Sequence, residues 1–516
     1  PDGPQPGVVL RTRVGSRDPE LTVTAAPLPA CAHHRGGRAT PAPRTRQRET
    51  MTAFRDSGPP PGADAADTHR PAVVVITDLV VLAKHLRLLD AAGRRGLTPL
   101  FVFGPETPAD ELARHRRDPR HPLSRLADDD VRHVTDTSLD TLLHGVAPWL
   151  RDRQVRAVLN VGEVFVEAAG ALAETLGLPG PGTHAARVCR NKLLQRLAAP
   201  ALAPRWTLLD PARSTAPEGW DTFPAVLKPA SRMSSSGVRA ITGPHALPPL
   251  LPGYGPGELL LLEERIAGAE FSVESLVRDG AVLWAGITAK DTNESGTSFF
   301  TETGHTSPAP HLTPAQESLL LDANTEFLRA VDFGTGMSHA EFRLTARNRV
   351  VLMEAAARPP GDAITRLWRL ATGMDLDAAL LDLALGTEPA TAPPRRRARQ
   401  VYLDHPRGLL ADVTAEAAPV HWVSEQGRWP DLPPAAQGAP PRDHAVLVSR
   451  HRGDLLGDQS DSQGRSVSVV LDGPLDADLD RAAHEAARRV TIHTVPPAAA
   501  TDAPAATPAP TGEAVR

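Results

Sequence analysis

The sequence predicts an α/β protein whose N-terminal part contains a parallel sheet. The continuous apolar runs 72–76 and 100–103 are typical of buried strands, and residues 79–92 between them have the periodicity of a helix. The same order returns in a strand at 155–161 and a helix at 164–176. Strands that alternate with helices favour a parallel α/β layer. No G-x-G-x-x-G follows the first strand, so the dinucleotide-binding fingerprint is missing.

Composition and charge narrow the functions that the chain can have. Its 516 residues exceed one ordinary domain, and 41% hydrophobic with 23% charged residues is a globular composition. The 56 basic and 61 acidic residues give a net charge of −5, and only 4% are aromatic, which argues against a nucleic-acid or membrane binder. The two cysteines, Cys31 and Cys189, fit no disulfide framework. We expect a cytoplasmic protein with small-molecule partners, no nucleic acid and no membrane.

Five segments are predicted along the chain. Proline-rich, unpatterned ends indicate disorder, and apolar periodicity between them indicates folded parts. The segments are a disordered N-terminal extension (1–70), an N-terminal α/β domain (71–185), a central domain (186–390), a small C-terminal α/β lobe (391–495) and a disordered tail (496–516). The first methionine is Met51, which we expect to be the natural start.

Lysine is rare in this chain. Of the 56 basic residues, only Lys84, Lys192, Lys228 and Lys290 are lysines, and the rest are arginines. A compact ammonium group can place a point charge on a phosphate, which a planar guanidinium does less well. The lysines are therefore candidate phosphate ligands, except Lys84, which lies on a predicted helix and is explained by chance.

A predicted hairpin brings two glutamates together. Residues 339–344 and 350–354 have the pattern of strands, and a two-residue turn at Arg347 and Asn348 would place Glu341 directly opposite Glu354. Like charges in such a pair repel, unless a cation lies between them. Oxygen ligands shared with phosphates suit Mg²⁺. On spacing alone, a metal site and an exposed glutamate pair are equally supported.

The residues after Glu354 favour a ligand site. Three alanines leave room for a ligand, and Arg358 can stabilise developing anionic charge, although a surface salt bridge is the alternative. Asp362 either anchors a substrate ammonium or caps the helix that begins near Ala363, and capping is the favoured reading.

A second set of residues is typical of phosphate binding. The apolar strand 223–229 contains Lys228, and the small residues Ser234, Ser235, Ser236, Gly237 and Val238 follow at loop distance. Small residues let backbone N–H groups approach phosphate oxygens. The chain contains no Gly-Lys dipeptide, H-E-x-x-H or G-x-S-x-G, which excludes a P-loop, a zincin and a nucleophile elbow.

The next segment combines a buried strand with a hairpin. Residues 259–266 are apolar and become polar at Glu263, and Glu270 follows shortly after. Strands at 271–277 and 281–287 enclose Asp279-Gly280, which is a strong hairpin signal.

Taken in order, these residues resemble the ATP-grasp superfamily across about 72–494. The similarity is strongest to carboxylate–amine ligases of the L-amino-acid-ligase type, because residues 301–308, Thr-Glu-Thr-Gly-His-Thr-Ser-Pro, match their Glu-x-Gly-His segment beside the substrate. The resemblance implies an α/β (α+β ATP-grasp) fold, in which 71–185 is the pre-ATP-grasp domain and 186–390 the two-lobed ATP-grasp domain.

The resemblance also implies roles for individual residues. It places ATP against Lys192, Lys228, Lys290, the loop Ser234, Ser235, Ser236, Gly237 and Val238, and the adenine and ribose residues Glu263, Glu264, Ile266 and Glu270. It assigns Mg²⁺, or Mn²⁺, to Glu341 and Glu354, and the catalytic and substrate-lining roles to Arg358, Glu302 and His305. The chain departs from the family at Ala356, where an asparagine is usual, and at Arg232-Met233, where a glycine is usual.

The implied function is an ADP-forming ligase that joins a carboxylate to an amine through an acyl phosphate, with amino acids or similar metabolites as substrates. A homodimer is a further expectation. The alternatives are an ATP-grasp carboxylase-like enzyme, a ligase that acylates a carrier protein, and a degenerate module that only binds ATP.

Overall fold

The computed structural model describes residues 70–211 and 218–497. The predicted disordered ends, 1–70 and 496–516, therefore lie almost entirely outside the described residues. Within the described ranges, no helix combines the length and the apolar character that crossing a bilayer requires.

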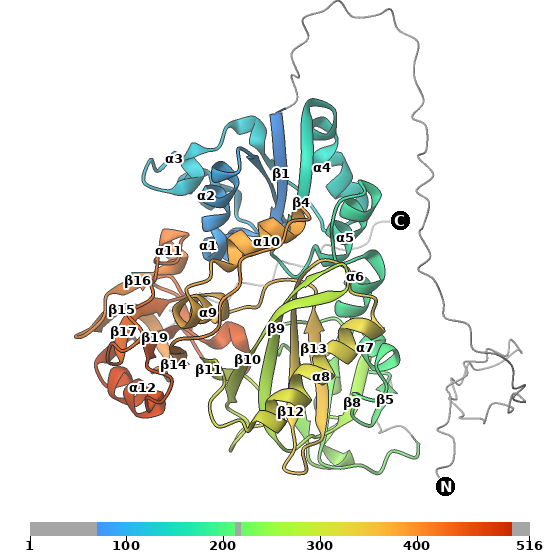
Figure 1. Cartoon of the computed structure of the whole chain (residues 1–516). Helices are drawn as coiled ribbons and strands as arrows, with labels where there is room; N and C mark the ends of the chain where they lie inside the picture. The colour runs from blue at the N-terminus through green and yellow to red at the C-terminus, as the bar shows by residue number, and fades with distance from the viewer. Residues whose placement is uncertain (1–69, 212–217, 498–516) are drawn as a thin grey trace, which may run out of the picture. The chain divides into compact units, whose positions relative to one another are not determined.

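The N-terminal part is a four-stranded parallel sheet, as predicted (Figure 1). Its strands, in the order β3-β2-β1-β4, are β1 (Arg70–Thr77), β2 (Thr98–Phe103), β3 (Val131–His133) and β4 (Arg153–Asn160). The predicted helix 79–92 is divided at Leu86 into α1 (Leu79–His85) and α2 (Arg87–Arg94).

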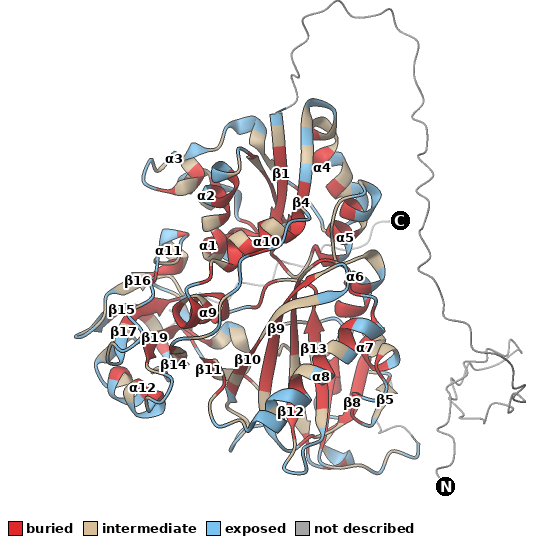
Figure 2. Cartoon of the chain, viewed as in Figure 1, coloured by how far each residue is buried: buried red, intermediate tan, exposed pale blue. Residues whose placement is uncertain are grey.

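Both faces of this sheet are buried, which explains the continuous apolar runs (Figure 2). In β1, Val73 and Val75 pack with α1, α2 and α10 (Leu376–Ala384). Val74 and Ile76 pack with α4 (Leu139–Asp152) and α5 (Val166–Thr175) on the other face. Helix α3 (Ala109–Arg117) follows β2.

Two further sheets form the central part of the chain. The smaller one is antiparallel, in the order β5-β8-β6-β7, and consists of β5 (Trp206–Leu209), β6 (Ala225–Pro229), β7 (Arg239–Ile241) and β8 (Leu260–Glu264). Helices α6 (Thr183–Cys189) and α7 (Lys192–Ala198) precede it in the chain.

The larger sheet has nine strands in the order β13-β12-β9-β10-β11-β14-β19-β17-β16. Its first five strands are β9 (Ala269–Arg278), β10 (Ala281–Thr292), β11 (Glu302–Ser307), β12 (Gly336–Leu344) and β13 (Val350–Ala356). The apolar residues of one face pack against α8 (Pro314–Ala330), and α9 (Ile364–Thr372) follows β13. The predicted hairpin between β9 and β10 is confirmed, since Arg278 pairs with Ala281 and both Asp279 and Gly280 have positive φ.

The C-terminal part continues the same sheet. It contributes β14 (Arg397–Tyr402), β16 (Val420–Trp422), β17 (Arg442–Val448) and β19 (Val467–Gly473), and β14 pairs directly with β11. The remaining elements are α11 (Val423–Gln426), α12 (Leu479–Ala487) and a small sheet of β15 (Gly408–Ala415), β18 (Leu455–Leu456) and β20 (Val490–Val495). The domain boundaries at 185, 390 and 495 stay predictions.

Candidate active site

A cleft that is partly open to solvent is lined by residues of both central sheets. All the site residues predicted from the sequence lie along it, except Ser236 and Gly237. It also contains side chains that the sequence did not single out, including Ser462 and Arg465 from the segment before β19.

Strand periodicity explains why Lys228 and Glu263 meet at one end of this cleft. In β6 and β8, Leu227 and Leu262 point into the core of the small sheet, so that Lys228 and Glu263 point the other way. Lys228 Nζ lies 2.8 Å from Glu263 Oε2, and Arg196 Nε donates to Glu263 Oε1 at 2.7 Å. Burial alone would raise the pKa of Glu263, but the two cations outweigh it and lower the pKa to about 2. Arg196, from α7, was not predicted.

The hairpin of β12 and β13 places Glu341 opposite Glu354, as predicted. The predicted two-residue turn is wrong, because the chain reverses over Ala346, Arg347 and Asn348, and Asn348 is the residue with positive φ. The register of the hairpin shifts by one residue between Glu341 and Phe342, which compensates for the longer loop. Glu341 therefore still lies opposite Glu354.

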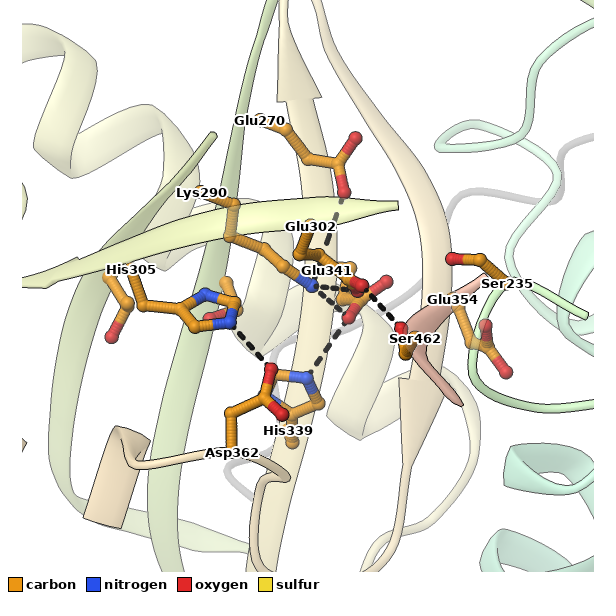
Figure 3. Close-up of polar contacts among 12 residues, drawn as sticks. Ser235, Glu270, Lys290, Glu302, His305, His339, Glu341, Glu354, Asp362 and Ser462 are labelled. Atoms are coloured by element: carbon orange, nitrogen blue, oxygen red, sulfur yellow. Dashed lines mark hydrogen bonds and ion pairs between the residues drawn. The ribbon is translucent and has the colours of Figure 1, made fainter. Parts of the chain in front are cut away.

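Glu341 and Glu354 each form an ion pair with a different lysine. Lys192 Nζ donates to Glu354 Oε1 at 2.8 Å, and Lys290 donates to Glu341. Lys290 Nζ also lies 3.3 Å from Glu302 Oε1 and 4.0 Å from Glu270 Oε1 (Figure 3). Burial alone would lower the pKa of Lys290, but the three carboxylates raise it above its usual range.

Neighbouring strands hold these carboxylates in place. His339 lies on the same face of β12 as Glu341, and its ring nitrogens bond to Glu274 at 2.9 Å and to Glu341 at 3.1 Å. Burial alone would lower the pKa of His339, but these hydrogen bonds raise it. Arg343, the next residue on this face, binds Glu270 at 2.8 Å.

The carboxylates of Glu341 and Glu354 fit a metal ion that takes its remaining ligands from water or phosphate. Within residues 70–211 and 218–497, no three His, Cys, Asp or Glu side chains come together in a way that could hold a metal ion. Glu341 and Glu354 offer oxygen donors to Mg²⁺, which commonly takes its other ligands from water and phosphate. The lysines beside them fit the phosphates themselves.

The serine-rich loop reaches the cleft with an unusual backbone. Ser234, Ser235 and Gly237 all have positive φ, and Ser235 Oγ donates to Phe300 O at 3.2 Å. Ser462 N donates to Ser234 O at 3.1 Å, so the loop contacts the C-terminal part of the chain.

Arg358 lies at the wall of the cleft and forms an ion pair with Glu163, which also holds Arg190. Burial alone would raise the pKa of Glu163, but the two arginines lower it. Glu163 follows β4 of the N-terminal sheet, and no local sequence pattern marked it.

Asp362 does not cap α9, so the favoured prediction for it was wrong. The structure gives α9 an N-cap at Ala363, without a side-chain capping bond from the described residues. The carboxylate of Asp362 instead binds His305 Nε2 at 2.7 Å, the Tyr402 hydroxyl at 2.9 Å and both terminal nitrogens of Arg465 (Figure 3 shows the first pair). Burial alone would raise the pKa of Asp362, but Arg465 and His305 hold it well below its usual range.

Glu302 links this end of the cleft to Lys290. Ser462 Oγ donates to Glu302 Oε2 at 2.8 Å, and Arg465 Nη1 donates to the backbone oxygen of Glu302 at 3.2 Å. The predicted pair Glu302 and His305 therefore faces one side of the cleft together with Asp362 and Arg465.

Two sheets line a cleft that contains lysines and paired carboxylates, in a chain with an α/β fold. Residues 255–366 match the family model of the ATP-grasp domain. The chain thus contains an ATP-grasp domain, and the resemblance and the fold class predicted from the sequence are confirmed.

Solved structures share this fold. The L-amino acid ligase from Bacillus licheniformis matches with a TM-score of 0.63 and 16% identity, over 83% of this chain and 100% of that one. Phosphoribosylglycinamide synthetase from Anaerococcus prevotii matches with a TM-score of 0.58 and 13% identity, over 82% and 100%. The biotin carboxylase domain of the 2-oxoglutarate carboxylase from Hydrogenobacter thermophilus, in complex with ADP, its magnesium salt and bicarbonate, matches with a TM-score of 0.53 and 15% identity, over 82% and 90%. Comparison with curated protein sequences finds no match.

Proposed function

We propose that the protein is an ATP-dependent carboxylate–amine ligase that forms an amide bond and releases ADP and phosphate. The observation that carries the proposal is the composition of one cleft. Lysines and paired carboxylates suited to a magnesium nucleotide lie beside Arg358 and a charged end that contains Glu302 and His305. The fold shared with an L-amino acid ligase supports amino acids or similar metabolites as substrates.

The cleft residues have distinct roles in this proposal. Lys192, Lys228 and Lys290 bind the phosphates, and Glu341 and Glu354 would hold Mg²⁺. Bound Mg²⁺ supplies charge neutralisation at the phosphate oxygens. The adenine and ribose lie toward Glu263, Glu264, Ile266 and Glu270, and the loop 234–238 covers the phosphates and excludes water.

The reaction has two steps. A substrate carboxylate oxygen attacks the γ-phosphorus of ATP, which gives an acyl phosphate and ADP. The amine then attacks the acyl carbon, loses a proton and expels phosphate. Arg358 stabilises the negative charge on the acyl oxygen in the second step. A cytoplasmic location and a homodimer are part of the proposal.

ADP release tests the proposal. The protein is incubated with Mg-ATP and each proteinogenic amino acid, alone and in pairs, and mass spectrometry identifies any product. We expect ADP that depends on an amino acid, together with a conjugate lighter than its parts by one water. Formation of AMP would contradict the acyl-phosphate route. Turnover only with bicarbonate, or only with a holo carrier protein, would assign the chain to a carboxylase-like or carrier-acylating enzyme instead.

A further inference from the structure

One segment of the C-terminal part lies against the cleft of the central part. We call this segment, residues 458–465 between β18 and β19, the strap. Gln459 O accepts hydrogen bonds from Asn293 Nδ2 at 3.0 Å and from Thr301 Oγ1 at 3.1 Å, in the connection from β10 to β11. Another strap residue, Ser462, lines the cleft itself. The strap therefore joins the C-terminal part to the residues around the cleft.

Ser462 binds a different part of the site with each of its polar groups. Its N–H donates to Ser234 O in the serine-rich loop at 3.1 Å. Its hydroxyl donates to Glu302 Oε2 at 2.8 Å (Figure 3). Its carbonyl accepts a hydrogen bond from Arg465 Nε at 3.1 Å, and Arg465 is the ion-pair partner of Asp362. One residue thus connects the loop proposed to cover the phosphates with the end of the cleft proposed to face the substrate.

Local contacts hold the strap in place independently of the loop. The Asp461 carboxylate accepts hydrogen bonds from Gln463 N at 3.0 Å and from Gly464 N at 3.2 Å, which caps the helical turn that begins at Ser462. Arg465, directly after this turn, is fixed by its ion pair. The strap therefore provides a fixed point against which the serine-rich loop can close.

The serine-rich loop needs such a fixed point. Ser234 and Ser235 have φ values of +59° and +57°, a left-handed conformation that is uncommon for residues other than glycine. A residue keeps this conformation only where its surroundings hold it. The Ser235 hydroxyl donates to Phe300 O at 3.2 Å, and Ser234 O accepts the hydrogen bond from Ser462 N. Loss of the bond to Ser462 should therefore let the loop open more often.

Glu302 supplies the other half of the connection. Besides the bond from the Ser462 hydroxyl, its carboxylate lies 3.3 Å from Lys290 Nζ and 3.8 Å from Arg465 Nη1. Phosphates that attract Lys290 would weaken the first of these ion pairs. The Ser462 hydroxyl belongs to a capped turn, so it keeps Glu302 in position when the lysine turns to the phosphates.

We infer that Ser462 is a positioning residue, which couples the closure of the loop 234–238 to the orientation of Glu302. The coupling matters for the chemistry, because water that enters an open cleft attacks the acyl phosphate in place of the amine and returns the free carboxylate and phosphate. The inference deepens the proposed function and rests on it, since it takes the loop to cover the phosphates and Glu302 to face the substrate.

Two substitutions separate the two connections that Ser462 makes. Ser462→Ala removes only the hydroxyl, whereas Ser462→Pro also removes the N–H. Proline suits this position, because Ser462 is the first residue of a helical turn and the residue before it has an extended backbone. Gln463→Ala is the matched control in the same turn, since the side chain of Gln463 is exposed.

Hydrogen–deuterium exchange of the full-length protein tests the contact between strap and loop without turnover. In the nucleotide-free protein, Ser462→Pro should speed the exchange of residues 234–238 about fivefold, as for the loss of one hydrogen bond, and Ser462→Ala and Gln463→Ala should change it less than about twofold. Mg-ADP should slow the exchange of residues 459–464 in the wild type and in Ser462→Ala, but not in Ser462→Pro. Equal exchange of the loop in Ser462→Pro and the wild type would overturn the inference.

The ratio of ADP to amide product tests the connection to Glu302. We expect about one ADP per amide in the wild type. Ser462→Ala should raise this ratio at least about twofold and change the KM for ATP less than about twofold, because water competes with the amine while the nucleotide still binds. A raised KM with an unchanged ratio would show a merely structural role and overturn the inference. If no substrate gives an amide, the proposed function fails, and faster loop exchange in nucleotide-free Ser462→Pro would still support the coupling.

Discussion

Glu341 and Glu354 face each other across β12 and β13, yet each carboxylate is bound to a different lysine. Lys290 and Lys192 offset the repulsion between the two negative charges in the protein without nucleotide. A divalent cation at this position competes with both ammonium groups. Phosphates that attract the lysines would free the carboxylates, so metal and nucleotide binding should be strongly coupled.

This coupling can be measured with Mn²⁺. We expect Mn²⁺ to bind at least about tenfold more tightly in the presence of ADP than in its absence, which is an ordinary size for coupling between ligands. Lys290→Met should raise the affinity for Mn²⁺ without nucleotide, because it removes a competing cation. Electron paramagnetic resonance of free Mn²⁺ gives both affinities. The control is Arg481→Met, since Arg481 is exposed and pairs with Glu485 on α12. An unchanged affinity in Lys290→Met would contradict the competition.

The metal assignment itself makes a kinetic prediction. Glu341→Gln and Glu354→Gln should each lower the rate of ADP formation by about 100-fold or more, because a metal contributes several kcal/mol to charge stabilisation at transferring phosphates. The matched control is Glu317→Gln, an exposed residue in the first turn of α8, which should retain the wild-type rate. Full activity in either cleft variant would remove that glutamate from the metal site.

The buried charges around Glu263 predict a dependence of stability on pH. The pKa of Glu263 is lowered from an ordinary value of 4.5 to about 2, so the ionised carboxylate stabilises the folded state above pH 4.5. This contribution is lost as the pH falls from about 4.5 to about 2. Glu263→Gln should therefore lower the free energy of unfolding by about 3 kcal/mol at pH 7, since it leaves Arg196 and Lys228 without their partner.

Urea unfolding at pH 7 and at pH 3 checks this prediction. The difference between Glu263→Gln and the wild type should be smaller at pH 3, where protonation begins to make the wild type resemble the variant. A difference that stays constant between the two pH values would mean that Glu263 is not held ionised by its neighbours.

Close packing under β10 predicts a sensitive glycine. A methyl group at Gly286 would overlap the ring of Trp368, which packs edge-on against Trp284 and donates to Glu274 at 2.9 Å. Gly286→Ala should lower the free energy of unfolding by about 1–3 kcal/mol, as is usual for an overpacked core. Gly253→Ala is the control, because an added methyl group there meets open space. Denaturation followed by tryptophan fluorescence compares the two, and equal stabilities would contradict the prediction.

Local patterns predicted the parts of the site that local structure determines. Alternation along a strand was sufficient to place Glu341 and Arg343 on one face, and the turn assumed at Arg347 and Asn348 placed Glu341 opposite Glu354. The loop between them was predicted one residue too short. Glu341 still pairs with Glu354, because the register shift in the hairpin compensates for the longer loop. No residue in the turn predicts this register shift.

Contacts between distant segments could not be predicted in this way. Arg465 lies 103 positions from Asp362, and Glu163 lies 195 positions from Arg358. The aspartate at 362 is a good local capping signal, but a cap supplies fewer bonds than the three partners that tertiary structure brings to it. A chain with 52 arginines also hides the few that form buried pairs among the many at the surface.

The pairing of β11 with β14 has a consequence for how the protein can be divided. β11 carries Glu302 and His305, and its outer edge is covered by a strand from the C-terminal part. A truncation at residue 390 would leave that edge with unpaired N–H and C=O groups, ready to recruit a strand from another molecule. The C-terminal part is therefore not a separable module. A chimera that is meant to exchange substrate preference between two proteins of this fold should therefore take β11 and β14 from the same parent.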